Sequence, residues 1–542
     1  MQKGIHLKKI REKNGMTVRS FAERLNVAPS YISRVENNKV PPSKELVKSI
    51  AKTFQANGDI LLALTGHLPN KWQKAVRETS HLQYGQVPKA NGDNGPTPIK
   101  YGLERLVLNG LGSLVDPLLS LFPSGYVPSP QLNEVYELKL AALEANLLRP
   151  ADLIDRGAYF LEINGQPTNH FRVCTGKPLQ IGKDGSLRLK SFFNTHQFKT
   201  SYATHGLFPY RGKFHPQMIK AIINVMGLKP GDKILDPMMG SGTTVIEASL
   251  MGIDAVGVDV SPFCVFTSKA KLGGLNVPLQ HLQRTIADKV LIKRQFDYLS
   301  SKKGQESIVD SQFKPDHITR DAFNLIALAY LDSQGFARRS GRNSHSGFFE
   351  EVLKKYCFAI DKFQSAKKGF KFELGQGEVL EADSRHLPLP ANSIDGALFS
   401  PPYSFAVDYL DNDLTQLEYM KCDADKLRDS MIGLRGKKGR ERVEIYFDDM
   451  KKSLQEIKRV LKPGKYCVIV VGSNSNQLSE ALGLDPDSDE SKFGLEMKLI
   501  EMANDLGLNA ELTLRRLIVG MANSMREEHI LFFKSNPIAE MN

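Results

Sequence analysis

The sequence has few cysteines and no long hydrophobic segment. Its five cysteines, Cys174, Cys264, Cys357, Cys422 and Cys467, are odd in number and spread over 542 residues, which fits neither a disulfide framework nor a cysteine-based zinc site. No apolar run approaches the roughly 18 residues of a membrane helix. The first residues, MQKGIHLKKIREKNG, lack the apolar core of a secretory signal. We therefore expect a soluble protein of the reducing cytoplasm, without a membrane partner.

Two kinds of ligand site are also missing from the sequence. His205, His215, His345 and His386 are not spaced as metal ligands are, so no metal site is expected. Neither the GxxxxGK[ST] loop of nucleoside triphosphatases nor a full GxGxxG dinucleotide loop occurs. The chain is therefore expected to bind neither a triphosphate nor a dinucleotide through these loops.

The overall composition is that of a globular protein with several domains. Hydrophobic residues make up 41% of the chain and charged residues 24%, which is enough to build a core. A length of 542 residues exceeds that of one ordinary domain. The formal charge of +12 favours a polyanionic partner such as nucleic acid. No feature of the sequence sets an oligomeric state.

Residues 1–69 have apolar residues at helical spacing, separated by short polar turns. Thr17 is a candidate N-cap for a helix over Val18–Leu25, and a second helix is predicted over Pro29–Glu36. From Leu7 to Thr65 the pattern resembles the lambda-repressor-like helix-turn-helix family. This implies an all-α DNA-binding domain whose second helix enters the major groove. The alternative is a helical packing module that binds no nucleic acid, or one that binds protein. The residues expected to face DNA are Ser30, Tyr31, Ser33, Arg34 and Asn37.

Two segments of less definite character follow. Residues 70–102 include the Gly, Pro and Asn-rich stretch GQVPKANGDNGPTPIKYG and are predicted to be a linker. Residues 103–203 mix helical stretches such as ELKLAALEANLL with strand-like ones such as YFLEING and SLRLKSFF. They match either a target-recognition region or an extension of the domain that follows.

From residue 204 to residue 542 strands and helices alternate. This predicts an α/β fold, namely a doubly wound Rossmann-like sheet with an antiparallel edge hairpin. Between 271 and 370 the pattern is helical and basic, which indicates an insertion. The predicted elements are strands at 233–235, 255–259, 372–383, 394–400 and 465–473, helices at 243–251 and 450–464, and a hairpin of 508–520 with 527–534.

Polar residues follow several of these strands, where open α/β sheets bind their ligands. DPMMGSGTT follows the first strand, and its glycines allow close backbone approach to a ligand at a helix N-terminus. Asp259 ends the second strand and can accept both hydroxyls of a ribose. Asp383 follows the third and can accept from an adenine amino group. The fourth ends in SPPY, Ser400–Tyr403.

The loop and the tetrapeptide together resemble those of the S-adenosylmethionine-dependent amino-methyltransferase family, whose signatures are DPFxGSGTT and (D/N/S)PP(Y/F/W). Met238 stands where that family usually has Phe. The resemblance covers residues 208–534 and implies S-adenosylmethionine as cofactor. Lys213–Ile223 resembles the family's cofactor-flanking helix. The cofactor-binding residues that the resemblance implies are Phe214, His215, Asp236, Pro237, Met238, Gly240, Ser241, Gly242, Thr243, Thr244, Asp259, Val260, Ser261, Asp383 and Ser384.

The same resemblance implies the chemistry of SPPY. Ser400 Oγ and the carbonyl oxygen of Pro401 would accept the two N–H groups of an exocyclic amine, and Pro401 and Pro402 would fix that carbonyl. Tyr403 would stack on a base rotated out of the duplex. SPPY favours methylation of cytosine N4 over adenine N6. A side-chain nucleophile or a metal is not required.

The resulting expectation is a site-specific DNA methyltransferase with double-stranded DNA as partner, in a restriction-modification or other defence system with a cognate partner protein. A tRNA amino-methyltransferase is one alternative, because such enzymes share the sheet and a similar tetrapeptide. Another is a transcriptional regulator whose methyltransferase domain senses the cofactor. In a mixed case, the N-terminal module represses the protein's own promoter while the catalytic domain methylates DNA elsewhere.

Overall fold

The computed structural model describes most of the chain, and the structural statements below concern these residues. Within them, no helix is both long and apolar enough to cross a membrane. None of the five cysteines forms a disulfide. The described residues are 4–37, 39–54, 122–129, 132, 135–174, 201–210, 213–302, 318–340, 345–402, 409–437, 439–472, 475–483, 494–519 and 525–536.

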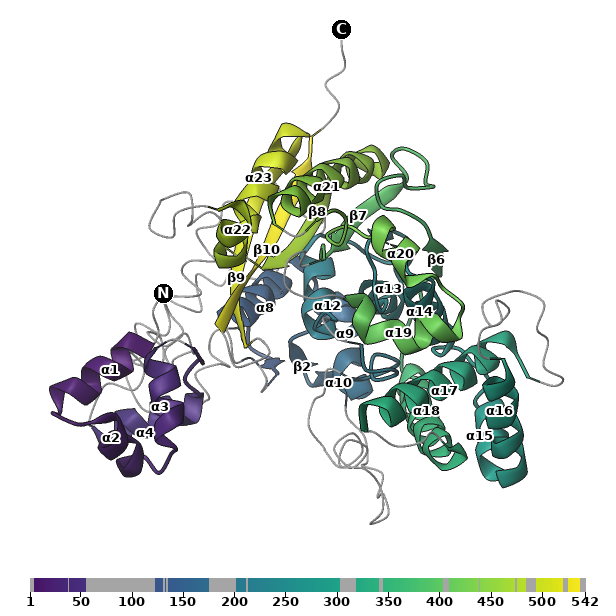
Figure 1. Cartoon of the computed structure of the whole chain (residues 1–542), viewed down its shortest axis with the longest axis horizontal. Coiled ribbons are helices and arrows are strands. Elements are labelled where there is room, and N and C mark those ends of the chain that lie inside the picture. Colours follow the sequence, from purple (N-terminus) through teal and green to yellow (C-terminus); the bar gives the residue numbers. More distant parts are fainter. Residues whose placement is uncertain are drawn as a thin grey trace, which may run out of the picture.

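The N-terminal unit contains the two predicted helices. Thr17 accepts a hydrogen bond from the backbone N–H of Ser20 and so caps the first of them. Arg11 and Glu36 join helices α1 and α3 through two hydrogen bonds of 2.6 and 2.8 Å. Apolar residues from all four helices form one core. The helices are α1 (Gly4–Lys13), α2 (Val18–Arg24), α3 (Pro29–Glu36) and α4 (Lys44–Thr53), as Figure 1 shows in purple.

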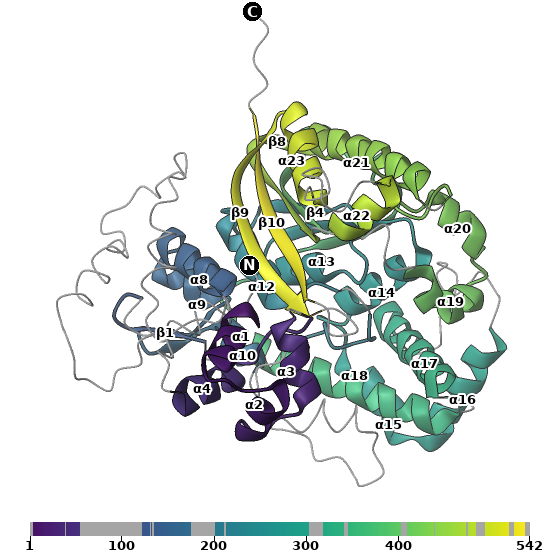
Figure 2. The ribbon, with the colours of Figure 1, turned by 60° about the vertical axis from the view of Figure 1, so that its left-hand side comes forward.

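A seven-stranded sheet, in the order β6-β5-β4-β7-β8-β10-β9, confirms the predicted doubly wound fold. Strands β6, β5, β4, β7 and β8 are parallel, whereas β10 pairs antiparallel with both β8 and β9. Figure 2 shows the β9–β10 hairpin in yellow at one edge of the sheet. The strands are β4 (Lys233–Asp236), β5 (Asp254–Asp259), β6 (Gly377–Glu381), β7 (Ile394–Phe399), β8 (Leu461–Gly472), β9 (Leu508–Val519) and β10 (Met525–Ser535).

Helices cover both faces of the sheet. Successive strand residues point to opposite faces, so that Ile234 packs with α12 and α13 while Leu235 packs with α21 and α23. The β7 strand is buried along its whole length, as expected of a central parallel strand. The remaining helices of this domain are α12 (Pro216–Val225), α13 (Thr243–Leu250), α14 (Pro262–Gly273), α19 (Tyr409–Tyr419), α20 (Ala424–Ser430), α21 (Arg440–Val460), α22 (Ser475–Leu482) and α23 (Leu495–Asp505).

The prediction that the helix beginning at Met450 continues to Gly464 is wrong. It ends at Val460, and residues 461–464 already belong to β8. Pro463 explains the early end, because proline lacks an N–H and disfavours helical geometry at the residue before it. The same helix also begins earlier than predicted, at Arg440.

Residues 122–174 pack directly against the sheet domain. Most of their buried apolar residues belong to the same core cluster as α12 and strands β4, β8 and β10, whereas Val173 and Cys174 belong to a separate cluster with Ile246 and Phe363. Buried Glu144 fixes this junction by accepting hydrogen bonds from the Ala158 N–H at 2.9 Å and the Asn224 side chain at 2.6 Å. The elements are β1 (Tyr126–Pro128), α8 (Val135–Leu147), α9 (Pro150–Arg156), β2 (Phe160–Ile163), β3 (Gln166–Pro167) and α10 (Asn169–Cys174).

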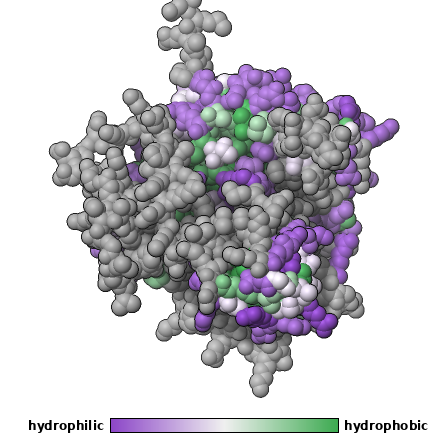
Figure 3. Space-filling view, turned by 90° about the vertical axis from the view of Figure 1, so that its left-hand side faces the viewer, coloured by the Kyte–Doolittle hydropathy of each residue, from purple (hydrophilic) through white to green (hydrophobic). Residues whose placement is uncertain are grey.

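The insertion between β5 and β6 is helical in its described residues, as predicted. Its helices pack with α14 and α19 around a second apolar core. Figure 1 shows them gathered at the lower right. Figure 3 shows the side of the molecule that lies at the left in Figure 1, where hydrophilic residues border two small groups of apolar ones. The insertion comprises α15 (Leu279–Ala287), α16 (Lys289–Ser301), α17 (Arg320–Ser340) and α18 (Ser346–Lys367). The predicted linker 70–102 and the strand-like stretch 186–193 lie outside the described residues.

Candidate active site

An open pocket of about 930 Å³ lies at the carboxyl ends of β4, β5, β6 and β7. This volume includes open solvent at the mouth of the pocket. The position is where ligands bind in open α/β sheets. The residues that line it are Tyr210, Lys213, Phe214, Pro237, Met238, Met239, Gly240, Ser241, Thr243, Asp259, Val260, Cys264, Ala382, Asp383, Ser384, Ser400, Pro401, Pro402, Ser430, Met431 and Ile432.

The glycine loop after β4 supplies one wall of this pocket. Gly240 and Gly242 have φ angles of +50° and +77°, in the left-handed region that glycine tolerates. At Gly242, which begins α13, a Cβ would come within 2.7 Å of Ser268 Oγ on α14. Gly242 therefore permits both the turn and the close packing of two helices.

Asp236 lies beneath the loop, outside the pocket lining. Its carboxylate accepts a 3.2 Å hydrogen bond from the Met238 N–H. Burial raises the pKa of Asp236 to about 7, and nearby Asp259 contributes in the same direction. Asp236 therefore hydrogen-bonds to the backbone of the glycine loop.

Asp259 joins the end of β5 to the glycine loop. One carboxylate oxygen accepts from the Gly240 N–H and the other from the Ser261 N–H, both at 2.9 Å. Burial raises the pKa of Asp259 to about 6, although these hydrogen bonds oppose the rise. Ser261 also caps α14 by accepting from the Cys264 N–H. Asp259 therefore both lines the pocket and holds two of its backbone segments.

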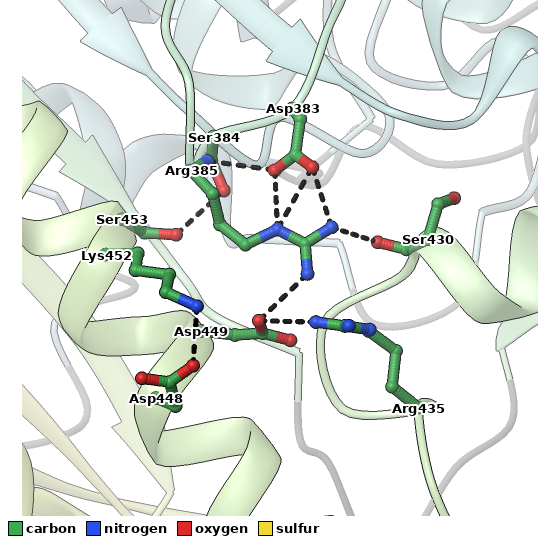
Figure 4. Close-up of polar contacts among 9 residues, drawn as sticks. All are labelled: Asp383, Ser384, Arg385, Ser430, Arg435, Asp448, Asp449, Lys452 and Ser453. Carbon is green, nitrogen blue, oxygen red and sulfur yellow. Dashed lines mark hydrogen bonds and ion pairs between the residues drawn. The ribbon is translucent and has the colours of Figure 1, made fainter.

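Asp383, after β6, faces the pocket and is held by Arg385 (Figure 4). Burial alone would raise the pKa of Asp383, but hydrogen bonds from the Arg385 side chain and backbone lower it overall. Ser384 is buried, with its Oγ 3.0 Å from Ser453 Oγ on α21. Asp383 is thus ionised and fixed in orientation.

At the end of β7, Ser400, Pro401 and Pro402 line the same pocket as the glycine loop. Neither proline has an N–H to donate, so the chain leaves the sheet ladder at this point. Tyr403, the last residue of the predicted tetrapeptide, lies outside the described residues. Three of the four predicted catalytic residues are therefore brought next to the predicted cofactor loop.

Some predicted cofactor residues lie behind the lining. Gly242, Thr244 and Ser261 belong to the helix starts that support it. The ring of His215 is largely buried, which lowers its pKa to about 4, and its Nδ1 has no hydrogen-bond partner among the residues that the structure describes. Its neighbour Phe214 does line the pocket.

The pocket also includes residues that the sequence did not single out. Tyr210 lies against Gly240, where a Cβ would be 3.4 Å from its ring, and its hydroxyl is 3.4 Å from Cys264 Sγ. Ser430–Ile432 forms another part of the wall, just before the basic stretch Gly433–Arg442. The sequence offered one signal for Tyr210, which is that it is an aromatic residue shortly before the predicted flanking helix.

His205 has a structural environment between two helices. Its Nε2 lies 2.5 Å from Glu247 Oε1, which also accepts from the Tyr202 hydroxyl at 2.6 Å. Lys220 lies 3.3 Å from the other oxygen of Glu247. Burial would raise the pKa of Glu247, but these partners lower it to about 2. The cluster stabilises the packing of α12 against α13.

The five residues predicted to face DNA lie on or next to α3. Ser30, Arg34 and Asn37 are exposed, whereas Tyr31 and Ser33 are half-buried. The Tyr31 hydroxyl accepts a hydrogen bond from the Ser43 N–H at 3.1 Å and so positions the start of α4. Arg34 is therefore the exposed cation of this helix.

Two family models match parts of the chain. Residues 7–61 match one described as helix-turn-helix, and residues 207–305 match one described as RMKL-like, methyltransferase domain. These ranges coincide with the N-terminal helical unit and with the glycine loop, β5 and the first insertion helices.

Relatives of known function also match in part. The type II methyltransferase M.MjaII of Methanocaldococcus jannaschii is 26% identical over 174 residues, 31% of this chain and 32% of that protein. M.BsoBI of Geobacillus stearothermophilus is 24% identical over 291 residues, 43% of this chain and 56% of that protein. A tRNA (guanine(10)-N2)-dimethyltransferase of Methanothermobacter thermautotrophicus is 45% identical over 53 residues, 10% of this chain and 16% of that protein. The chain thus spans less than two thirds of the length of each.

Proposed function

We propose that the chain is an S-adenosylmethionine-dependent DNA methyltransferase that modifies an exocyclic amine of a base, with cytosine N4 favoured. One observation carries the proposal: Ser400, Pro401 and Pro402 share a pocket with the glycine loop, Asp259 and Asp383. An acceptor group for an amine thereby lies beside a surface suited to a nucleoside.

The pocket fits S-adenosylmethionine by the chemistry of its lining. Asp259 and Asp383 supply carboxylates for ribose hydroxyls and an adenine amino group, and suit a cofactor that carries positive charge. Phe214, Met238 and Ile432 supply apolar walls. When bound, the cofactor supplies the methyl group.

The residues of SPPY would act on the amine rather than on the cofactor. Ser400 Oγ and the Pro401 carbonyl oxygen would accept hydrogen bonds from the two N–H groups of the amine. These hydrogen bonds favour a tetrahedral nitrogen, whose lone pair is then less delocalised into the base ring. Pro401 and Pro402 restrict the backbone, so this carbonyl is oriented in advance. Tyr403 would stack on the flipped base. Catalysis then rests on positioning and hydrogen bonding.

DNA is the proposed substrate because of the N-terminal unit and the longer similarities. The helix-turn-helix match covers residues 7–61, and the two relatives named type II methyltransferases match over 174 and 291 residues. We propose a restriction-modification or related defence setting with a cognate partner protein. The unpaired cysteines support a cytoplasmic location.

A tRNA amine is the second candidate, supported by the 45% identity over 53 residues to a tRNA dimethyltransferase. Methyl transfer from radiolabelled S-adenosylmethionine to duplex DNA and to bulk tRNA, followed by nucleoside analysis, separates the two. We expect label on DNA as N4-methylcytosine. N6-methyladenine would correct the base, label on tRNA alone would replace the substrate, and no label on either would favour a cofactor-sensing regulator.

The role of the strand end has its own test. Ser400→Ala removes the proposed amine acceptor, so we expect a large loss of kcat with cofactor affinity nearly unchanged. The matched control is Ser393→Ala at the opposite end of β7, where Ser393 Oγ donates to the Pro390 carbonyl at 2.7 Å. Equal activity of the two variants would refute the role of Ser400.

A further inference from the structure

Arg385 occupies a central position between two walls of the pocket. It follows β6 by a few residues, and its side chain is only 10% exposed. Arginine is always charged, so a guanidinium at this depth requires several partners. The structure supplies them from three separate segments.

The first partner is Asp383, which lines the pocket. Arg385 Nε donates to Asp383 Oδ1 at 2.9 Å and to Oδ2 at 3.0 Å, and Nη2 donates to Oδ2 at 2.6 Å. This fork fixes the plane of the carboxylate. The Arg385 backbone N–H also donates to Oδ1 at 2.9 Å. Because Nε shares a single hydrogen between the two oxygens, three N–H groups occupy the carboxylate, which leaves about one of its four lone-pair directions for a ligand.

The other partners belong to a second segment of the pocket wall and to α21. Arg385 Nη2 donates to the Ser430 carbonyl at 2.8 Å, at the start of the wall segment Ser430–Ile432. Nη1 donates to Asp449 Oδ1 at 2.8 Å. Asp449 is fully buried and also accepts from Arg435 Nη1 at 2.7 Å, so two carboxylates face two guanidinium groups (Figure 4).

We propose that Arg385 is a positioning residue that aims Asp383 at the adenine amino group of the cofactor and holds Ser430–Ile432 against the pocket. The inference rests on the proposed function, because it takes Asp383 as the acceptor for that amino group. Lysine cannot replace the fork, since its single ammonium lacks the planar array of donors that reaches three segments at once.

Binding of the reaction product and of one analogue of it to the full-length protein tests this role. The ligands are S-adenosylhomocysteine and its 6-oxo analogue S-inosylhomocysteine, which lacks the amino group. For the unmodified protein, we expect tighter binding of the adenosyl ligand by calorimetry. Arg385→Ala should weaken that binding by about 10- to 100-fold, the worth of a hydrogen bond to a charged group. It should weaken binding of the inosyl ligand less, so that discrimination falls.

Two further variants make the test specific. Lys452→Ala removes an exposed ion pair with Asp448 on α21, close to Asp449 in sequence, and should leave both affinities unchanged. Arg385→Lys keeps the charge without the fork and should also lose discrimination. Added methylguanidine should restore part of the discrimination in Arg385→Ala but not in the unmodified protein.

Other outcomes overturn the inference in distinguishable ways. Equal loss for both ligands in Arg385→Ala and in Arg385→Lys would reduce Arg385 to a structural role. Unchanged affinities in both variants would make it dispensable. If the unmodified protein binds both ligands equally, Asp383 does not recognise the amino group and the inference fails while the proposed cofactor stands. If it binds neither ligand, the proposed function itself fails.

Discussion

Replacement of Asp259 by asparagine tests whether this residue holds the pocket in shape. The carboxylate accepts from the Gly240 N–H and the Ser261 N–H at 2.9 Å each, one on each oxygen. Asn has the same size but only one acceptor oxygen, and its NH₂ group would face a backbone N–H. One of the two backbone donors therefore loses its partner in Asp259→Asn.

The expected magnitude follows from that lost partner. An unsatisfied buried donor costs about 1–3 kcal/mol. At about 1.4 kcal/mol for each factor of ten, cofactor affinity should fall by about 5- to 150-fold if the loop must be in place to bind. Burial raises the pKa of Asp259 to about 6, so the residue is ionised at pH 8 and protonated at pH 5. The difference between the unmodified protein and the variant should accordingly shrink as the pH falls.

Calorimetric titration with S-adenosylhomocysteine at pH 8 and pH 5 measures both effects. Asp254→Asn is the matched control, because Asp254 lies at the other end of β5 and accepts from the Gln376 N–H at 2.8 Å, away from the pocket. If Asp259→Asn and Asp254→Asn bind the ligand with the same affinity at pH 8, the reasoning is wrong.

Three other predictions concern the glycine loop, the helix-turn-helix unit and the junction. Gly257→Ala places a Cβ against Met239 Sδ and Val245 Cγ2, so we expect a loss of about 1–3 kcal/mol in the free energy of unfolding, measured with denaturant; unchanged stability would contradict this packing. Arg34→Ala should weaken duplex binding and lower its salt slope by about one; an unchanged slope would point to a protein partner for this unit. Burial raises the pKa of Glu144 from 4.5 to about 7. The neutral carboxyl therefore stabilises the folded protein at low pH, and the free energy of unfolding falls by roughly 3 kcal/mol as the pH rises from below 4.5 to above 7. Glu144→Gln should remove this pH dependence from the unfolding free energy between pH 5 and 8. The same slope of unfolding free energy against pH in the variant and the unmodified protein would refute the prediction.

Strand periodicity was enough to predict the sheet, because a buried parallel strand such as Ile394–Phe399 is a short apolar run bounded by turn residues. The same logic located Asp259, Asp383 and Ser400, since ligands meet at strand ends. The end of α21 was missed because the predicted helix was carried past Pro463. The predicted domain boundaries and the role of Tyr403 remain predictions.

The other wall of the pocket could not be predicted from local pattern. Ser430–Ile432 reaches the site only through tertiary packing, and Arg385 meets Ser430 and Asp449, which are distant in sequence. Asp383 was recognised by its position after a strand. Arg385, which holds Asp383 in place, has no sequence pattern that indicates this role. Local sequence thus indicated the groups that would contact a ligand and left out those that hold them in place.

The pairing of β4 with β7 has a consequence for synthesis on the ribosome. Ile234 pairs with Gly396, and the helices α15–α18 lie between the two strands in the chain. A nascent chain that has released β4 and β5 therefore exposes the far edge of β4 until β7 follows. Such long-range parallel pairing forms slowly, and an unpaired apolar strand edge invites association with other chains. The glycine loop is thus synthesised well before the strand that brings Ser400 beside it. The wall of the pocket is therefore completed only late in translation.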